Sequence, residues 1–444
     1  MTSKRRGQGT AVPQTRIGRL VSLGLAAGEL AVGGAVEGLR RFASAQPAGA
    51  GSVFLTAASA ERLAARLARL RGAAMKLGQL LSLEGEDLVP PEFARALATL
   101  RSGASPMPPA QLHRVLGREW GAGWMRRFAR FDEEPLAAAS IGQVHRAQTV
   151  DGRDLAIKVQ YPGVARSVDS DVDNVAVLLR LLNLLPLEIE IAGVVDEAKR
   201  QLHEEADYLA EARHLARFRR LVADERRLAV PRVHADLTTQ RVLAMDYVHG
   251  EPLEALGAAG VAQRTRDETG AVLERLVFRE LFEFRAMQTD PNFANSLWDR
   301  AAGRIVLLDF GATREFSRAF VERFRAISRA VIAGNRARIR QLAIEIGYLA
   351  PEDSGERAEA IVQLIQLVCE PLRHRGPYDF AASDLPSRVR RLGFDLAFRK
   401  GFLRAPPPET LFLHRKLVGS FLLLARIGAR VNAHALVMPL LRSE

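Results

Sequence analysis

The chain has 444 residues, of which 48% are hydrophobic and 26% charged, and its formal net charge is +12. This length is enough for two or three lobes, each with a buried core, and the composition is that of an ordinary globular protein. Cys369 is the only cysteine, which excludes a disulfide framework and a cysteine-based metal site. The positive charge favours an anionic partner. Because no nucleic-acid-binding motif accompanies it, we expect no nucleic acid among the partners.

Residues 1–52 predict a basic segment with an apolar helix rich in Gly and Ala, followed by a linker. Seven Lys or Arg residues and two Glu residues occur in positions 1–41. A carboxylate at the centre of a bilayer costs about 3 kcal/mol, which disfavours a true membrane span. A helix that contacts a membrane surface or a partner, and a plain docking helix, both stay open. No small-residue cleavage site follows that would indicate a secretory signal.

Residues 53–110 predict a helical extension, because leucines recur at spacings of three and four. Near the end of its helix lies Lys76-Leu-Gly78-Gln79. A glycine inside a helix costs ~1 kcal/mol relative to alanine, so it usually marks close packing or a bend. Lys76 and Gln79 are three residues apart and share one helix face.

A β-hairpin is predicted next. Asp151-Gly152 is a hairpin turn signal, and the apolar strand 155–159 after it carries a single lysine, Lys158. A lysine in such a strand is similar to the Val-Ala-Ile-Lys lysine of protein kinases, which contacts ATP phosphates.

An alanine-rich segment precedes this hairpin turn: Ala137-Ala138-Ala139-Ser140-Ile141-Gly142-Gln143-Val144. Protein kinases cover the phosphates with Gly-x-Gly-x-x-Gly-x-Val. Gly142 and Val144 match that pattern, whereas Ala137 and Ala139 stand where it has glycines. Alanine partly keeps the close approach of backbone N–H groups to phosphates but stiffens the loop.

The segment 242–250 predicts a strand that ends in a glycine turn, which suits the hinge between two lobes. The candidate adenine-binding groups are the backbone atoms around Met245, Asp246, Tyr247 and Val248.

The most specific pattern is Asp290-Pro-Asn-Phe-Ala-Asn295, followed fourteen residues after Asn295 by Asp309-Phe-Gly311. Protein kinases hold Mg²⁺ on ATP with this spacing, and the first Asp is the catalytic base. Mg²⁺ takes a few oxygen ligands from protein and the rest from phosphates and water. Asp-Phe-Gly alone would favour an unrelated strand end. With the spaced Asn, we expect Asn295 and Asp309 to hold Mg²⁺ and Asp290 to act as the base.

Residues 320–444 predict mainly amphipathic helices, with breaks at 376–378 and 406–408. The apolar run 417–424 is too short to span a bilayer.

These ordered motifs resemble the UbiB/aarF-domain family of atypical protein-kinase-like proteins. Its coenzyme Q (ubiquinone) biosynthesis branch, found in mitochondria and proteobacteria, is matched through residues 283–292, 308–315 and Leu413-His414-Arg415-Lys416. The resemblance covers about residues 14–440 and rests on six segments: Lys76-Leu-Gly78-Gln79, the loop 137–144, Lys158-Val-Gln-Tyr-Pro-Gly163, Glu205-Ala-Asp207, Asp290 to Asn295 and Asp309-Phe-Gly311.

The resemblance implies an α+β, bilobal protein-kinase-like fold with a small antiparallel-sheet N-lobe and a mostly helical C-lobe. We expect four parts in chain order: the basic segment 1–52, the Lys-x-Gly-Gln extension 53–110, the N-lobe 111–248, and the C-lobe with its helical C-terminal region 249–444.

The resemblance also implies residue roles. Lys158 contacts the α- and β-phosphates and pairs with Glu211 on the helix after its strand. Glu205 and Asp207 pair with Lys76, whose segment through Gly78 and Gln79 occludes the place where a kinase binds its peptide. Asp207 is four residues before Glu211 and is expected nearer to its helix face than Glu205 is. Without the resemblance, these three acids would read as a solvated helix face.

Two departures from protein kinases guide the functional hypothesis. Gln288 and Thr289 replace His-Arg of His-Arg-Asp, which argues against control by a phosphorylated activation loop, and no Ala-Pro-Glu segment follows Asp309. The resemblance therefore favours an Mg²⁺-dependent ATPase that supports ubiquinone biosynthesis by handling lipid intermediates. A phosphotransferase acting on a small molecule or a protein, and a nucleotide-gated lipid-binding scaffold, stay open as alternatives.

The expected partners are ATP, phenolic or isoprenoid quinone-precursor lipids and an anionic membrane surface. Other ubiquinone-biosynthesis proteins and a second copy of the chain are left open. The expected location is cytoplasmic and peripheral to the inner membrane in a bacterium, or the matrix face in a mitochondrion.

Overall fold

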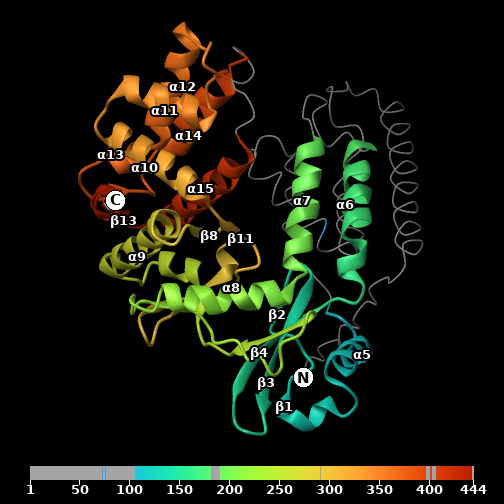
Figure 1. Ribbon diagram of the computed structural model, residues 1–444. Coiled ribbons are helices and arrows are strands. Elements are labelled where there is room, and N and C mark those ends of the chain that lie inside the picture. Colours follow the sequence, from blue (N-terminus) through green and yellow to red (C-terminus); the bar gives the residue numbers. More distant parts are fainter. Residues whose placement is uncertain are drawn as a thin grey trace, which may run out of the picture. The chain divides into compact units, whose positions relative to one another are not determined.

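The computed structural model describes residues 73, 76, 106–181, 191–290, 292–396, 401–402 and 407–442. Contacts divide the chain into two compact units, Met1–Arg213 with Arg232–Tyr247 and His214–Pro231 with Val248–Glu444 (Figure 1). The predicted segment 1–52 and most of the extension 53–110, including Gly78 and Gln79, lie outside the described residues.

The first unit is built on an antiparallel sheet. Its strands are β1 (Phe128–Phe131), β2 (Ala137–Ala138), β3 (Gly142–Thr149), β4 (Asp154–Gln160) and β6 (Val242–Asp246), with β1-β3-β4-β6 in order and β2 paired to β3. The predicted hairpin joins β3 to β4, and Gly152 at its turn has φ +87°, which suits glycine. Val144 on β3 lies opposite Lys158 on β4.

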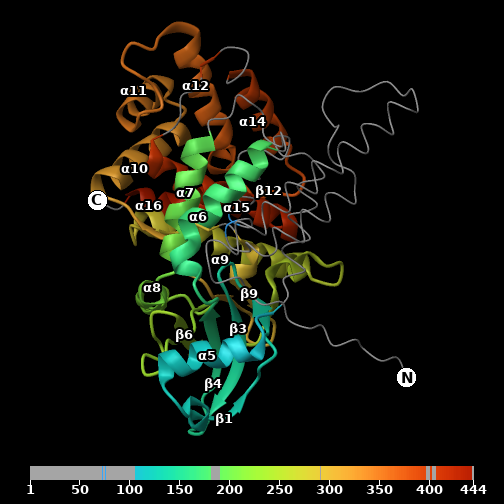
Figure 2. The same cartoon turned by 90° about the vertical axis from the view of Figure 1, so that its right-hand side faces the viewer.

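Helix α5 (Pro109–Trp120) and the 3₁₀ turn η2 (Trp124–Arg127) pack on this sheet (Figure 2). Trp120, Trp124 and Phe128 form an aromatic cluster with ring centroids 5.3–6.0 Å apart. Helices α6 (Val164–Leu181) and α7 (Ile191–Glu205) pack side by side (Figures 1 and 2), and α8 (Tyr208–Leu221) follows.

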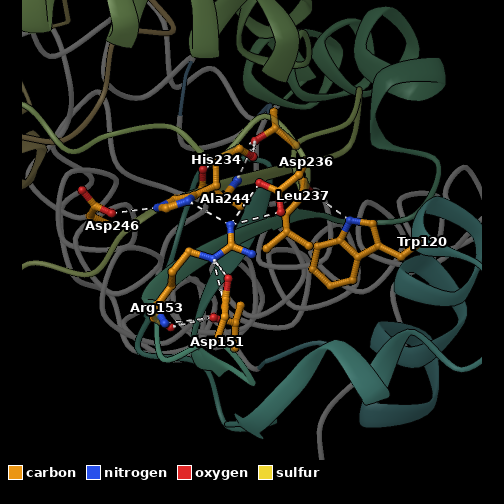
Figure 3. Close-up of polar contacts among 10 residues, drawn as sticks. Trp120, Asp151, Arg153, His234, Asp236, Leu237, Ala244 and Asp246 are labelled. Carbon is orange, nitrogen blue, oxygen red and sulfur yellow. Dashed lines mark hydrogen bonds and ion pairs between the residues drawn. The ribbon is translucent and has the colours of Figure 1, made fainter.

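A polar network fixes the end of β6 (Figure 3). His234 lies between Arg153 and Asp246, with 3.2 Å from its Nδ1 to the Arg153 Nη1 and 2.7 Å from its Nε2 to the Asp246 Oδ1. Arg153 also binds Asp151 and Asp236. The contact between His234 and the Asp246 side chain therefore fixes the end of β6, where the hinge is predicted.

The second unit contains helix α9 (Gln263–Phe282) and two small sheets. One sheet has the order β5 (Leu228–Ala229), β10 (Arg304–Leu307), β9 (Ser296–Asp299) and β7 (Glu251–Pro252); the other pairs β8 (Ala286–Gln288) with β11 (Thr313–Glu315). The 3₁₀ turn η3 (Leu253–Gly257) follows β7 in the chain, and the 3₁₀ turn η4 (Phe293–Asn295) lies between β8 and β9. Short loops thus place Asp290 just after β8 and Asp309 just after β10.

The rest of the second unit is mainly helical, as predicted. Its elements are α10 (Arg318–Ile332), α11 (Arg336–Ile346), α12 (Gly355–Val368), α13 (Glu370–Arg373), β12 (Tyr378–Asp379), α14 (Leu385–Phe394), α15 (Pro408–Ile427), β13 (Arg430–Val431) and α16 (Ala433–Arg442). Helices α15 and α16 pack on α9, and apolar side chains of α9, α10 and α16 share a core. Within the described residues, we find no helix whose length and hydropathy would let it cross a membrane.

Candidate nucleotide site

The first unit joins Lys158 to Glu211, the partner that the resemblance implied. The Lys158 Nζ lies 2.9 and 3.0 Å from the two carboxylate oxygens of Glu211, and both residues are buried. The Nζ also lies 5.1 Å from the ring centre of Tyr208, a cation–π distance. Glu211 lies on α8, the third helix after β4, because α6 and α7 intervene.

The alanine-rich segment forms a tight turn between β2 and β3, in which the Ala139 N–H donates to the Gly142 carbonyl at 2.9 Å. A Cβ on Gly142 would lie 2.3 Å from the Val159 carbonyl oxygen, so only glycine fits against β4. Ala137 and Ala138 are exposed, whereas Gly142 is buried. The turn is thus anchored at one end and open to a ligand at the other.

Glu205 joins two of the predicted segments within the first unit. Its Oε1 lies 2.5 Å from the Lys76 Nζ, and its Oε2 accepts a hydrogen bond from the Ser140 Oγ. Lys76 is buried, and the Glu205 side chain is 13% exposed. Lys76 is therefore joined through Glu205 to Ser140 in the alanine-rich turn, a link that no sequence pattern predicted.

Glu205, Asp207 and Glu211 do not lie on one continuous helix. Glu205 is the last residue of α7, and α8 begins at Tyr208. Asp207 lies between them and accepts a hydrogen bond from the Ala210 N–H at 2.9 Å, as a helix N-cap does. Because the helix breaks here, Glu205 points to Lys76 while Glu211 points to Lys158.

In the second unit, Asp290, Asn295 and Asp309 line one cavity of about 80 Å³ between α9, α15 and the two loops. The Asn295 Nδ2 donates to the Asp290 Oδ2 at 3.1 Å, and the Asn295 carbonyl accepts from the Leu308 N–H. The Asp309 Oδ1 accepts from the Gly311 N–H at 2.9 Å. The spacing of the two motifs therefore does bring these three side chains together.

The donors around this cavity fit Mg²⁺. The amide nitrogen of Asn295 is used by Asp290, which leaves the Asn295 Oδ1 for a cation. In the described part of the chain, no group of three or more His, Cys, Asp or Glu residues forms a cage for a metal. Mg²⁺ needs no such cage, because it usually takes one or two carboxylates together with phosphates and water.

An ion pair between Lys416 and the buried Glu280 lines the same cavity, and no sequence pattern predicted it. The Lys416 Nζ on α15 lies 2.9 Å from the Glu280 Oε2 on α9. Burial raises the pKa of the Glu280 carboxyl, and the charge of Lys416 opposes that rise. The available signal was the C-terminal segment Leu413 to Lys416, to which no role was given.

Backbone hydrogen bonds within the protein reduce the number of groups that could bind adenine at the predicted site. The Asp246 N–H donates to the Arg232 carbonyl and the Tyr247 N–H to the Asp154 carbonyl, both at 2.9 Å. Neither N–H can then bond adenine. Within residues 246–248, the Val248 N–H and the backbone carbonyls remain as candidates.

Comparison with known proteins identifies the family. The ABC1 atypical kinase-like domain matches residues 99–343, more than half of the chain. The chain belongs to the ABC1 atypical kinase-like family. The family resemblance inferred from the six segments is thereby confirmed, and so is the α+β kinase-like fold.

Several members of the ABC1 family align with almost the whole chain. It is 39% identical to the mitochondrial atypical kinase COQ8B of Rattus norvegicus over 95% of this chain and 79% of the relative. It is 35% identical to the mitochondrial atypical kinase COQ8 of Saccharomyces cerevisiae over 95% of this chain and 84% of the relative. A solved Mycobacterium tuberculosis protein in complex with erythromycin matches with a TM-score of 0.61 and 27% identity, covering 86% of this chain and 95% of that protein.

Proposed function

We propose that this ABC1 family protein is an Mg²⁺-dependent ATPase that supports coenzyme Q biosynthesis by handling lipid intermediates. The observation that carries the nucleotide part is the buried, two-pronged ion pair between Lys158 and Glu211. Burying a lysine and a glutamate is costly, and their attraction repays that cost only when the geometry of the pair is good. In kinases, a strand lysine held by a helix glutamate binds the ATP phosphates.

We assign roles to the site residues of each unit in turn. In the first, Lys158 binds the α- and β-phosphates, and the turn 137–144 lies over phosphate oxygens with its backbone. In the second, Asn295 and Asp309 would hold Mg²⁺, which would neutralise phosphate charge. Adenine bonds to backbone groups of the 245–248 segment.

In the proposed reaction, Asp290 accepts a proton from water as the water oxygen bonds to the terminal phosphorus. The bond from that phosphorus to the bridging oxygen breaks, and ADP and phosphate leave. The Asn295 Nδ2, 3.1 Å from the Asp290 Oδ2, orients the carboxylate toward the cavity. Phosphoryl transfer needs positioning and charge stabilisation more than covalent help from the protein.

The contacts of Glu205 support water over a protein as the phosphate acceptor. Lys76 and Ser140 both bind Glu205, so Lys76 is held beside the proposed phosphate turn. We propose that this motif, with Gly78, Gln79 and Asp207, occupies the room of a peptide substrate. Thr289, which replaces the kinase arginine, instead bonds the Ala312 carbonyl through its Oγ1 at 2.8 Å.

The coenzyme Q role is supported by relatives that carry the name COQ8. We propose phenolic or isoprenoid precursor lipids as ligands, and peripheral attachment to an anionic membrane through the basic N-terminal segment. A deletion strain complemented with the parent chain should recover its quinone content, whereas Asp290→Asn should not complement it.

The direct test measures ADP release by the purified full chain with Mg²⁺-ATP. It uses phosphatidylcholine vesicles with and without phosphatidylglycerol and a polyprenyl phenol, together with a search for phosphorylated products. Lipid-stimulated ADP release without such a product would support the ATPase. A phosphorylated lipid or protein would establish a phosphotransferase instead, and lipid binding that changes with nucleotide but without ADP release would establish a scaffold. Asp224→Asn, an exposed carboxylate of the second unit, is the matched control for Asp290→Asn.

A further inference from the structure

The C-terminal segment Leu413-His414-Arg415-Lys416 lies on α15, and the metal and phosphate roles proposed above do not use it. Leu413 is buried in the core of the second unit. The His414 Nε2 lies 2.7 Å from the hydroxyl oxygen of Tyr348. Lys416 differs from them, because its side chain lines the cavity of Asp290, Asn295 and Asp309.

Lys416 is fixed in place by a buried carboxylate. Its Nζ lies 2.9 Å from the Glu280 Oε2; the Glu280 side chain is 1% exposed and that of Lys416 15%. The Glu280 Oε1 accepts a hydrogen bond from the Gln288 N–H at 3.3 Å. Gln288 is two residues before Asp290. The ion pair is therefore joined to the start of the proposed catalytic loop.

The charges around the cavity require a cation. Asp290, Asp309 and Glu280 contribute carboxylates, and among the described residues that line the cavity Lys416 is the only basic one. A terminal phosphate that enters would meet these carboxylates at short range, where like charges repel strongly. An ammonium has three donors, so Lys416 can bind Glu280 and still offer donors to a phosphate oxygen.

We propose that Lys416 is a further catalytic residue, whose ammonium binds the terminal phosphate of ATP and stabilises the negative charge on its oxygens during transfer. This inference rests on the proposed ATPase function. Lys416 forms and breaks no covalent bond: the phosphorus–bridging oxygen bond breaks, the water oxygen bonds to phosphorus, and the proton of the water passes to Asp290. Fixed cations beside the transferred group are a main source of rate in such reactions.

The test compares the parent chain with Lys416→Met, Lys416→Arg and the double variant Glu280→Gln/Lys416→Met. The turnover number for ADP release by Lys416→Met should fall about a hundredfold, the usual effect of losing one charge-stabilising donor. Binding of ADP, which lacks the third phosphate of ATP, should stay unchanged. Lys416→Arg should keep more activity because it keeps the charge. Lys199→Met is the matched control, because its Nζ lies 2.6 Å from Asp173 in the first unit and its side chain does not line this cavity.

The double variant separates catalysis from folding. Lys416→Met alone leaves Glu280 buried without a cation and can unfold the chain, whereas the double variant removes both charges. A folded but slow double variant supports the proposal. If the double variant regains the parental turnover number, Lys416 only neutralises Glu280 and the proposal is overturned. If the parent releases ADP and Lys416→Met releases it equally fast, only the role of Lys416 fails; if the parent releases none, the proposed function fails and this inference with it.

Discussion

The Nζ of Lys76 lies 2.5 Å from the Oε1 of Glu205, although 129 residues separate them in the chain. The same carboxylate accepts a hydrogen bond from Ser140 in the alanine-rich turn. One largely buried glutamate therefore holds both Lys76 and Ser140. Because the pair is withdrawn from water, its removal should affect both the stability of the first unit and the shape of the turn.

Lys76→Met should lower the free energy of unfolding by about 3 kcal/mol, because it leaves the Glu205 carboxylate without its cation in a nearly dry site. Denaturant unfolding of the full chain measures this. Lys76→Met/Glu205→Gln should recover much of the loss, since neither charge is then left alone. Lys199→Met, which breaks a pair with the exposed Asp173, should cost less than about 1 kcal/mol. Equal losses for Lys76→Met and Lys199→Met would contradict a buried pair.

Lys158→Met should weaken ATP binding about tenfold or more, the effect expected when a charged hydrogen-bond donor to phosphate is lost. Isothermal titration with ATP and ADP measures the change. Glu211 is then buried without a partner, so Lys158→Met/Glu211→Gln is needed to separate binding from folding. A stable double variant that binds ATP as tightly as the parent would exclude phosphate contact by Lys158.

Local patterns in the sequence predicted Lys158 and its hairpin, but not that Lys158 pairs with Glu211. The Asp151-Gly152 turn and the apolar run after it define strand and turn within a few residues. Glu211 was inferred from the resemblance alone, because two helices intervene and any acid along them satisfies helical periodicity. The break at Asp207 did have a signal: Asp is a favoured N-cap residue. The residues on either side of it, Glu204-Glu205 and Tyr208-Leu209, are however also compatible with one continuous helix.

The pair Lys416–Glu280 illustrates a limit of sequence reasoning. Its two residues are 136 positions apart, on α15 and α9, and neither helix shows a periodicity that distinguishes them from surface charges. Only the packing of α15 on α9 turns the two into a buried pair. Asp290, Asn295 and Asp309, by contrast, lie on two short loops next to paired strands, so their spacing was enough to predict that they meet.

Asp309→Asn should remove the dependence of ATP affinity on Mg²⁺, because it replaces a carboxylate ligand with a neutral amide. Titrations of ATP with Mg²⁺ and with EDTA measure that dependence. The fold should be kept, since asparagine can still accept from the Gly311 N–H. Asp224→Asn should leave the dependence as in the parent. An Asp309→Asn protein whose ATP affinity still rises with Mg²⁺ would mean that the metal binds elsewhere.

Gly142→Ala should destabilise the first unit by about 1 to 3 kcal/mol, the usual range for overpacking. The new Cβ would lie 2.3 Å from the Val159 carbonyl oxygen and 3.0 Å from the Tyr208 hydroxyl oxygen, so β3 or β4 must shift. Gly117→Ala is the matched control, because nothing lies within 4 Å of its Cβ and alanine favours the helix by about 1 kcal/mol. Thermal unfolding should therefore move in opposite directions for the two variants, and a shift of the same sign and size would contradict the close approach at Gly142.

His414 should make stability depend on pH. Burial lowers the pKa of His414 from 6.5 to about 4, so between these values the unfolded chain binds a proton that the folded chain refuses. Its contribution to stability is full above pH 6.5 and is lost as pH falls toward 4, by on the order of 3 kcal/mol. His414→Gln, which can still bond Tyr348, should flatten this part of the profile. The buried Glu274 and Glu280, whose pKa values are raised by burial, act in the opposite direction but cancel when the variant is subtracted from the parent. Denaturant midpoints at pH 7.5 and 4.5 test this, and parallel profiles for the two proteins would show that His414 takes up its proton in the folded state.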